Sequence, residues 1–184
     1  MRLLRHFDRA VALLASTAIA LSAMALLVSL ALIGYGVAMR YFANHPVVWV
    51  DELIGYLLVA IVMLAAADAL RKGEHIAVDI VTERLGPAGR RLTAASGLVA
   101  VAVCGAFLVE EGWGMVAFSR MVGIVSTGSL AMPVWLPQLL VPVGGGLLVL
   151  AALAGLARMA RGEPPTEEGS TPGSTPIGGG GRLE

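Results

Sequence analysis

Residues 47–79 decide the fold class, and they read VVWVDELIGYLLVAIVMLAAADALRKGEHIAVD. Within them, Leu53 to Leu70 form a hydrophobic run that only Asp68 interrupts, and the basic pair Arg71-Lys72 closes it. A run of about 20 apolar residues is long enough to cross the hydrocarbon core of a bilayer as a helix. Charged groups at membrane depth are costly, so they need water, a partner or a function. Asp68 lies three and four residues before Arg71 and Lys72, which is the spacing of a helical ion pair. The stretch therefore predicts a membrane-spanning helix with charged ends.

The composition of the whole chain agrees with a membrane protein. Of the 184 residues, 57% are hydrophobic and 14% are charged, and the mean hydropathy is +0.81, far from the values of a soluble domain. The formal net charge is zero, and no basic patch points to a nucleic-acid partner. The single cysteine, Cys104, excludes an intrachain disulfide and a cysteine metal site built from this chain alone. We expect Cys104 to be a small packing residue.

Four apolar runs lie at about residues 10–39, 47–70, 92–109 and 134–157. Each meets or approaches the length of a span, so we predict an all-α membrane protein with four transmembrane helices. The first run follows Arg2, Arg5 and Arg9 and imitates a secretory signal peptide. It is much longer than a normal signal core of roughly 7–15 residues, so we expect an uncleaved first span.

Lysine and arginine are distributed unequally between the two sides of these spans. With the N-terminus in the cytoplasm, that side collects nearly all of the bases before residue 162, and the opposite side keeps Arg40 and Arg120. Because cytoplasmic loops are enriched in such residues, the bias predicts that both termini are inside.

Two segments outside the spans have their own patterns. Residues 75–91 interleave apolar and charged side chains, which is typical of a short interfacial amphipathic helix but also of an ordinary linker. The last segment is rich in Pro, Gly, Ser and Thr and cannot bury an apolar core. We therefore divide the chain into a four-span membrane domain, residues 1–161, and a disordered cytoplasmic tail, residues 162–184.

The residues that could support catalysis do not form a recognisable set. His6, His45 and His75 all lie outside the apolar runs, where they cannot form the pair of axial ligands of a buried haem, and no metal-ligand or nucleotide-binding motif is present. The central turns of the first and third spans offer only small apolar residues and serines, whereas a translocation path needs polar groups near the midplane. The sequence predicts neither an enzyme nor a self-contained carrier, and no cofactor.

The charged and aromatic residues near the outer end of the second span allow two interpretations. Asp51 and Glu52 could simply complement the dipole of the helix N-terminus. Alternatively Glu52, on one helical stripe with Tyr56, meets a donor on another helix, within this chain or in a partner. Trp49 and Trp135 are placed like aromatic-belt residues.

Small residues recur at helical spacing in three of the predicted spans. In the third span, Ser96, Ala100 and Cys104 stand four apart, as do Ala151 and Gly155 in the fourth span. The series in the first span comprises Ala18, Ser22, Ala25 and Ser29. Such ridges let helices approach closely, either within this chain or against a partner. Pro142 predicts a kink, and the glycines from Gly144 would let another backbone come close.

Several of these residues together resemble a known family. Arg40-Tyr41-Phe42, then Trp49-x-Asp51-Glu52-Leu53, then Tyr56, and above all Arg71-x-Gly73-x-His75-Ile76-x-Val78-Asp79, are similar to the small permease subunit of tripartite ATP-independent periplasmic (TRAP) transporters, the DctQ type. Pro133-x-Trp135 and Leu140-Val141-Pro142-Val143-Gly144 also fit, and the resemblance covers roughly residues 10 to 160.

The resemblance implies a non-catalytic, multi-pass subunit in a bacterial inner membrane. It would scaffold a large many-span permease for sodium-driven uptake of an organic acid, a carboxylate, which a periplasmic substrate-binding protein delivers; membrane lipids would be its other partners. The residues assigned to structure or to the subunit interface are Arg40, Trp49, Asp51, Glu52, Tyr56, Arg71, Gly73, His75, Asp79, Trp135, Pro142 and Gly144. Arg71, His75 and Asp79 are expected to form a hydrogen-bonded knot.

Two other functions remain open from the sequence. A small four-span subunit of another uptake system, such as a tricarboxylate transporter, would lack the Arg-x-Gly-x-His-Ile-x-Val-Asp turn. A stand-alone membrane protein should move solute when reconstituted alone.

Overall fold

The computed structural model describes residues 2–72 and 87–162. This part of the chain is almost entirely helical and contains no strand. Its elements are α1 (Arg2–Phe42), α2 (Val48–Lys72), α4 (Pro87–Val122), the short α5 (Trp135–Gln138) and α6 (Leu140–Ala160). α1, α2, α4 and the α5–α6 unit are each long and apolar enough to cross a membrane, which confirms the predicted fold class.

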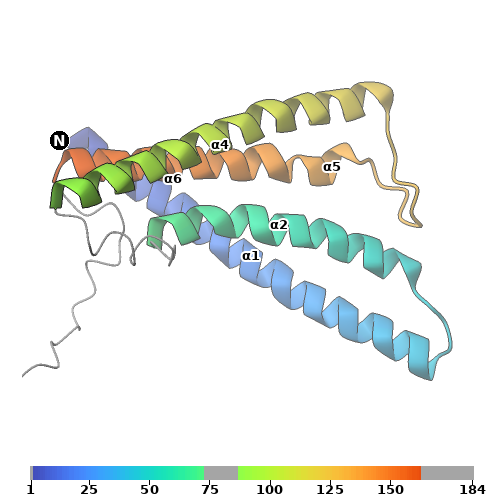
Figure 1. Cartoon of the computed structure of the whole chain (residues 1–184). Helices are drawn as coiled ribbons and strands as arrows, with labels where there is room; N and C mark the ends of the chain where they lie inside the picture. The colour runs from blue at the N-terminus through green and yellow to red at the C-terminus, as the bar shows by residue number, and fades with distance from the viewer. Residues whose placement is uncertain (1, 73–86, 163–184) are drawn as a thin grey trace, which may run out of the picture.

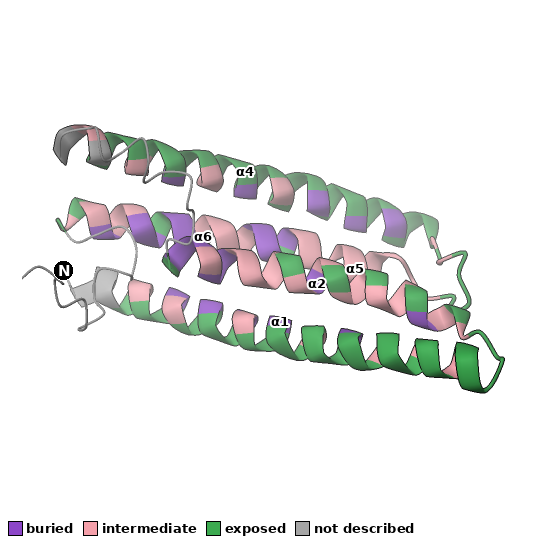
Figure 2. Ribbon diagram, turned by 60° about the horizontal axis from the view of Figure 1, so that its bottom comes forward, coloured by how far each residue is buried: buried purple, intermediate pink, exposed green. Residues whose placement is uncertain are grey.

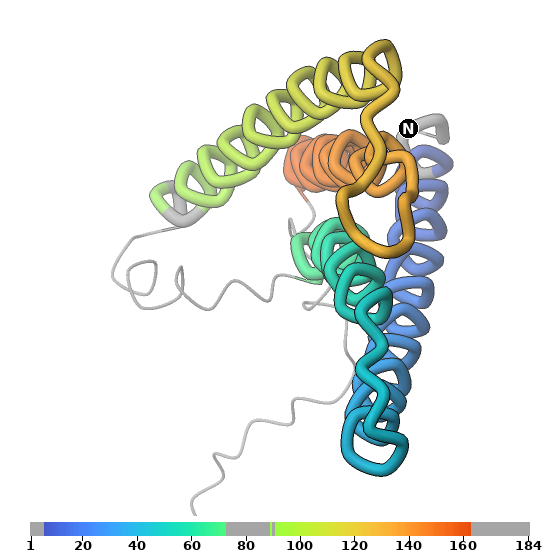
Figure 3. The backbone as a smooth tube through the Cα atoms, turned by 90° about the vertical axis from the view of Figure 1, so that its right-hand side faces the viewer, coloured from blue at the N-terminus to red at the C-terminus, as the bar shows by residue number. Residues whose placement is uncertain are grey.

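The four long helices lie in a row rather than around a common axis. α2 and α6 pack on each other in the middle, α1 packs on α2, and α4 packs on α6. α1 also touches α6, but the described parts of α1 and α4 share no contact (Figure 1). The α1–α2 pair and the α4–α6 pair diverge towards the loops at residues 43–47 and 123–134, as Figure 3 shows from that side. We call this end of the array the loop end.

The opposite end, here called the terminal end, carries the start of α1 and the end of α6 (Figure 1). The array therefore has the even number of crossings that the sequence predicts, although the cytoplasmic location of both termini stays a prediction. α6 is the most enclosed span, with 39% of its most apolar window buried, and α4 the least, with 11% (Figure 2). The outward faces of α1 and α4 are dominated by exposed apolar side chains.

Helix boundaries differ most from expectation in the third span. The apolar run suggested residues 92–109, but α4 begins at Pro87 and continues to Val122. Glu110 and Glu111, which directly follow the apolar run, therefore lie about three turns before the end of the helix. The reason is that an exposed charged pair interrupts hydropathy without breaking a helix. Pro87 suits the first helical position, because its fixed φ is helical and its missing N–H has no partner there.

Close packing between the helices rests on glycine and alanine. A Cβ at Gly144 would lie 2.6 Å from Cβ of Met63 and 2.9 Å from its carbonyl oxygen, so α6 approaches the backbone of α2 directly. Gly105 of α4 similarly lies against Gly145 of α6. The expectation that the glycine run admits another backbone is confirmed, and the backbones belong to α2 and α4. The buried cluster beside it consists of Ala67, Leu70, Leu98, Ala151 and Ala152.

The small-residue series of α1 and α4 have different environments. In α1, Ala18, Ser22 and Ser29 are buried, and the Ser22 hydroxyl donates to the carbonyl oxygen of Ile61 in α2 at 3.0 Å. In α4, Ser96, Ala100 and Cys104 are exposed. Cys104 is therefore not the buried packing residue that was expected from its apolar surroundings.

Candidate functional site

At the loop end, Glu52 joins α2 to the loop between α4 and α5. The Tyr56 hydroxyl donates to Glu52 Oε1 at 2.8 Å, and the backbone N–H of Leu130 donates to Oε2 at 3.2 Å. The Ser126 hydroxyl is a third hydrogen-bond partner. Charge-assisted bonds of this kind are the stronger class of hydrogen bond. Glu52 thus bonds Tyr56 on its own helix, on the stripe that the sequence predicts. Its other donors belong to a loop, whereas the second interpretation expected a donor on another helix.

The loop that receives Glu52 is held in a tight conformation. Ser126 N–H donates to the carbonyl oxygen of Met132 at 2.8 Å, and Gly128 N–H donates to Ser126 Oγ at 3.1 Å. A Cβ at Gly128 would overlap the Glu52 carboxylate, so the loop passes directly over it. Ala131 has a φ of 45°, a conformation that non-glycine residues seldom adopt. The carboxylate of Glu52 therefore links this loop to α2.

The remaining loop-end residues singled out from the sequence lie apart from Glu52. Asp51, in the first turn of α2, is exposed, which fits complementation of the helix dipole. Trp49 is half-buried, with its ring centroid 6.4 Å from that of Tyr35 in α1. Trp135 lies under the guanidinium of Arg120, whose carbon is 5.3 Å from the ring centroid. Arg40 is exposed at the end of α1.

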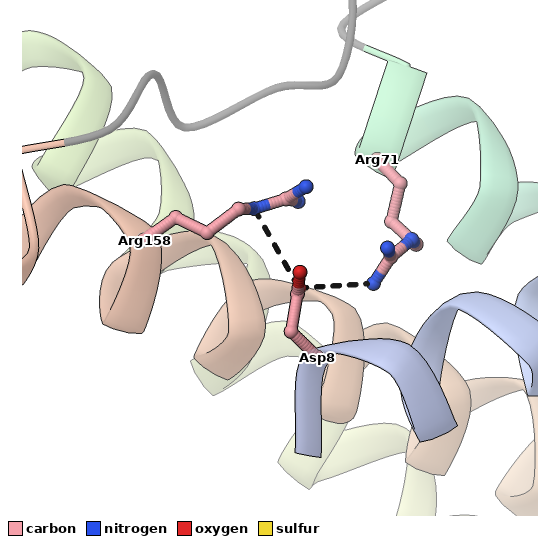
Figure 4. Close-up of polar contacts among 3 residues, drawn as sticks. All are labelled: Asp8, Arg71 and Arg158. Atoms are coloured by element: carbon pink, nitrogen blue, oxygen red, sulfur yellow. Dashed lines mark ion pairs between the residues drawn. The ribbon is translucent and has the colours of Figure 1, made fainter. Parts of the chain in front are cut away.

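At the terminal end, Asp8 connects three helices (Figure 4). Its Oδ1 lies 3.7 Å from a terminal nitrogen of Arg71 in α2 and 3.8 Å from Nε of Arg158 in α6. The two arginines are 2% and 6% exposed, so their charges are removed from solvent. A buried charge is tolerated only with a compensating partner, and the carboxylate of α1 supplies one. Asp8 therefore holds α1, α2 and α6 together at this end.

The expected knot of Arg71, His75 and Asp79 stays a prediction. Gly73, His75 and Asp79 lie outside the described residues, and within the described part Arg71 faces Asp8. Asp68 pairs with Lys72 at 2.7 Å, one of the two partners that the sequence spacing predicts. Asp68 itself is 9% exposed, so this pair lets a carboxylate lie among apolar side chains.

Pro142 and Gly144 lie where α6 packs against α4 and α2. α5 ends at Gln138 and α6 begins at Leu140, so the helix is irregular just before Pro142, as predicted. Pro142 is buried, and a Cβ at Gly112 of α4 would lie 2.9 Å from its Cδ. Both residues therefore determine how closely α6 approaches its neighbours.

Sequence reasoning missed Asp8, Arg158 and the loop residues Ser126 and Leu130. The signal for Asp8 was an acid within a strongly basic N-terminal segment, and that for Arg158 was a base at the end of an apolar run. Leu130 binds through its backbone N–H, which leaves no trace in the sequence.

Several charged side chains of the described residues take part in contacts within the chain. In residues 2–72 and 87–162, no group of three His, Cys, Asp or Glu side chains could hold a metal ion. The buried charged side chains in this part are Asp68, Arg71 and Arg158, all at the terminal end. The contacts of Glu52 and of Asp8 each connect one element of the chain to another.

Comparison with known proteins agrees with this architecture. Residues 29–162 match the family described as "Tripartite ATP-independent periplasmic transporters, DctQ component". The chain is also 31% identical, over 101 residues, to the C4-dicarboxylate TRAP transporter small permease protein DctQ of Rhodobacter capsulatus. That alignment covers 55% of this chain and 44% of the relative, so the chain spans less than half of that protein. The family match covers most of the chain, which therefore belongs to the DctQ component family of TRAP transporters.

Proposed function

We propose that this chain is a non-catalytic scaffold that braces a large many-span permease in the bacterial inner membrane. The complex takes up an organic acid, a carboxylate, using a sodium gradient and a periplasmic substrate-binding protein. The carrier chemistry belongs to the large permease. The name of the Rhodobacter relative supports a C4-dicarboxylate as the substrate to test first.

The exposed small-residue ridge of α4 carries this proposal. Ala100 and Cys104 line an entirely apolar hollow that also includes Ala66 and Ala69 of α2 and Leu148 of α6. Small side chains favour close approach of a further helix in lipid, where water supplies no driving force for association. In a self-sufficient four-helix protein such a ridge would be turned inwards, as the corresponding ridge of α1 is. The hollow is therefore suited to a helix of the large permease.

The absence of a polar route through the middle of the row supports the non-catalytic role. Among the described residues, the buried polar side chains of the central turns are serines, and the Ser22 and Ser29 hydroxyls donate to backbone carbonyls. A carrier needs polar groups that line a cavity near the midplane. The loops at residues 43–47 and 123–134 both lie at the loop end (Figure 3), where, with both termini inside, they would face the periplasmic binding protein.

Co-purification with the permease tests the scaffold. The tagged chain is extracted from native membranes in mild detergent, and its partners are identified by mass spectrometry. Ala100→Leu would fill the hollow and should lower the permease yield at least several-fold, whereas Ala106→Leu, on another exposed face of α4, should not. Equal permease yields with the two variants would contradict a docking role for the hollow. Recovery of the chain alone, in detergent and in nanodiscs, would contradict the scaffold itself.

A transport assay tests the division of labour. Proteoliposomes with this chain alone should not accumulate radiolabelled succinate. Vesicles that contain both membrane subunits and receive the loaded binding protein should accumulate it when sodium is high outside. Uptake by the chain alone would identify it as a carrier and overturn the proposal.

A further inference from the structure

A hollow at the loop end of α4 combines an apolar wall with one exposed cation. It has a volume of about 400 Å³ and lies between the last turns of α4 and the start of the α5–α6 unit. Its apolar lining includes Trp113, Val116 and Ala117 of α4 and Leu139. Arg120 and Trp135 also line it. The residues of α4 recur at helical spacing, so they form one continuous strip along the helix.

Arg120 is positioned and exposed but not neutralised. Its guanidinium lies over the Trp135 ring at 5.3 Å, an arrangement that fixes the cation without reducing its charge. No carboxylate of residues 6–72 or 91–162 forms an ion pair with it. Glu110 and Glu111 precede it on α4 by about 13–15 Å along the helix axis, beyond the range of direct pairing. An anion with two acceptor oxygens can therefore reach the N–H donors of Arg120 from outside.

The hollow lies at one end of a candidate membrane span. The candidate span of α4 runs from Arg91 to Val122, about 48 Å of helix, which exceeds a hydrocarbon core of about 30 Å, so part of the span lies outside the core. Arg120 is two residues from the end of α4, whereas Trp113 lies about 10 Å deeper. With Arg120 in the headgroup layer, the same hollow extends into the acyl-chain layer.

We propose that this hollow is a binding site for a single membrane phospholipid. The guanidinium of Arg120 donates to the phosphate oxygens, and one acyl chain lies along Trp113, Val116 and Ala117. The planar guanidinium binds phosphate oxygens in a bidentate manner, which a lysine cannot reproduce. A free phosphate ion would use the cation but leave the apolar wall unfilled, whereas a phospholipid occupies both. This inference requires only that the chain spans a membrane, and it holds independently of the transport role proposed above.

Native mass spectrometry of the full chain with phosphatidylglycerol in detergent micelles tests the site. Arg120→Gln should weaken binding of the first lipid about tenfold, because a hydrogen bond to a charged group is lost. Arg120→Lys, which keeps the charge, should give an intermediate affinity. Arg40→Gln is the matched control, since Arg40 is also exposed at the loop end but lies outside the hollow. Equal lipid binding by the Arg120→Gln and Arg40→Gln variants, with helical content unchanged, would overturn the proposal.

Two further measurements separate the alternative occupants. Inorganic phosphate at millimolar concentration should not displace the lipid; full displacement would identify an anion site rather than a lipid site. A photoreactive amino acid at position 117, in the complex within native membranes, should form an adduct with the mass of a phospholipid. An adduct with a polypeptide instead would show that a protein partner fills the hollow and would also overturn the proposal.

Discussion

The carboxylate of Glu52 and the backbone N–H of Leu130 are 78 positions apart in the sequence and 3.2 Å apart in the structure. This bond joins the first turns of α2 to the loop that follows α4, at the end where the two helix pairs diverge. It gives the 123–134 loop a fixed position relative to α2. The position of the 123–134 loop relative to α2 therefore depends on the Glu52 side chain.

Glu52→Ala should loosen this loop without unfolding the helices. The substitution removes the acceptor of Tyr56, Ser126 and Leu130, so the Leu130 amide should exchange with solvent faster. Hydrogen–deuterium exchange of the chain in nanodiscs measures this change. Asp51→Ala, at the exposed neighbouring position, should leave the exchange of Leu130 unaltered; a similar acceleration in both variants would show that Glu52 has no special role.

Gly128→Ala should reproduce the Glu52 phenotype from the other side of the contact. The added Cβ occupies the space of the carboxylate, which must move away and lose its bond to Leu130. The same exchange experiment should report a faster Leu130 amide. Ser129→Ala changes the adjacent exposed residue and serves as the control. Unchanged Leu130 exchange in the Gly128→Ala variant would mean that the loop can shift while keeping the bond.

Asp8→Asn should destabilise the terminal end of the array. The buried guanidinium groups of Arg71 and Arg158 lose the charge of their shared carboxylate, at a cost of about 1–3 kcal/mol. We place the effect in this range because both contacts are longer than a close ion pair. Thermal unfolding in detergent measures the loss. Arg9→Gln, at an exposed neighbouring position of α1, should change stability much less, and equal losses would argue against a specific role for Asp8.

Gly144→Ala should force α6 away from α2. The new methyl group would lie 2.6 Å from Cβ of Met63, and overpacking of this kind costs about 1–3 kcal/mol. Gly146→Ala adds the same methyl group two residues later, where nothing lies within 4 Å, and should be neutral or slightly stabilising. The difference in unfolding midpoint between these variants measures the tight approach. Identical midpoints would contradict it.

Ser22→Ala should have a small but measurable effect on the contact between α1 and α2. The hydroxyl bond to the Ile61 carbonyl crosses between the two helices, and such bonds contribute about 0.6 kcal/mol in membranes. Ser16→Ala is the control, because that hydroxyl donates to Leu13 within α1 and is exposed. A double-mutant comparison with a second α1–α2 contact would separate this bond from changes in helix propensity.

Much of the architecture was predictable because it depends on properties of short segments. The length of each apolar run predicted four spans, and the four-residue spacing of Asp68 and Lys72 predicted their ion pair. The same reasoning failed for the end of α4, where Glu110 and Glu111 ended the apolar run but not the helix. Hydropathy reports the preference of side chains for lipid, whereas helix continuation depends on the backbone.

The candidate site was predictable only in part. Glu52 and Tyr56 were singled out because charged or polar groups near apolar runs need partners, and Arg71 was singled out by the resemblance to the DctQ family. Their actual partners include a backbone N–H in a distant loop and Asp8 at the other end of the sequence. No local spacing relates these groups, so they could not be assigned before the helices were assembled.

By itself, then, the sequence determined an all-α membrane protein with four spans, because the length and polarity of each segment decide whether it crosses a bilayer. Only the tertiary structure decided the row order α1–α2–α6–α4, the burial of one small-residue ridge and the exposure of the other. It also decided that Asp8 serves two arginines and that Glu52 holds a loop. These features depend on which helices become neighbours, and that choice follows from close packing between glycines and alanines rather than from hydrophobicity, since every span is similarly apolar.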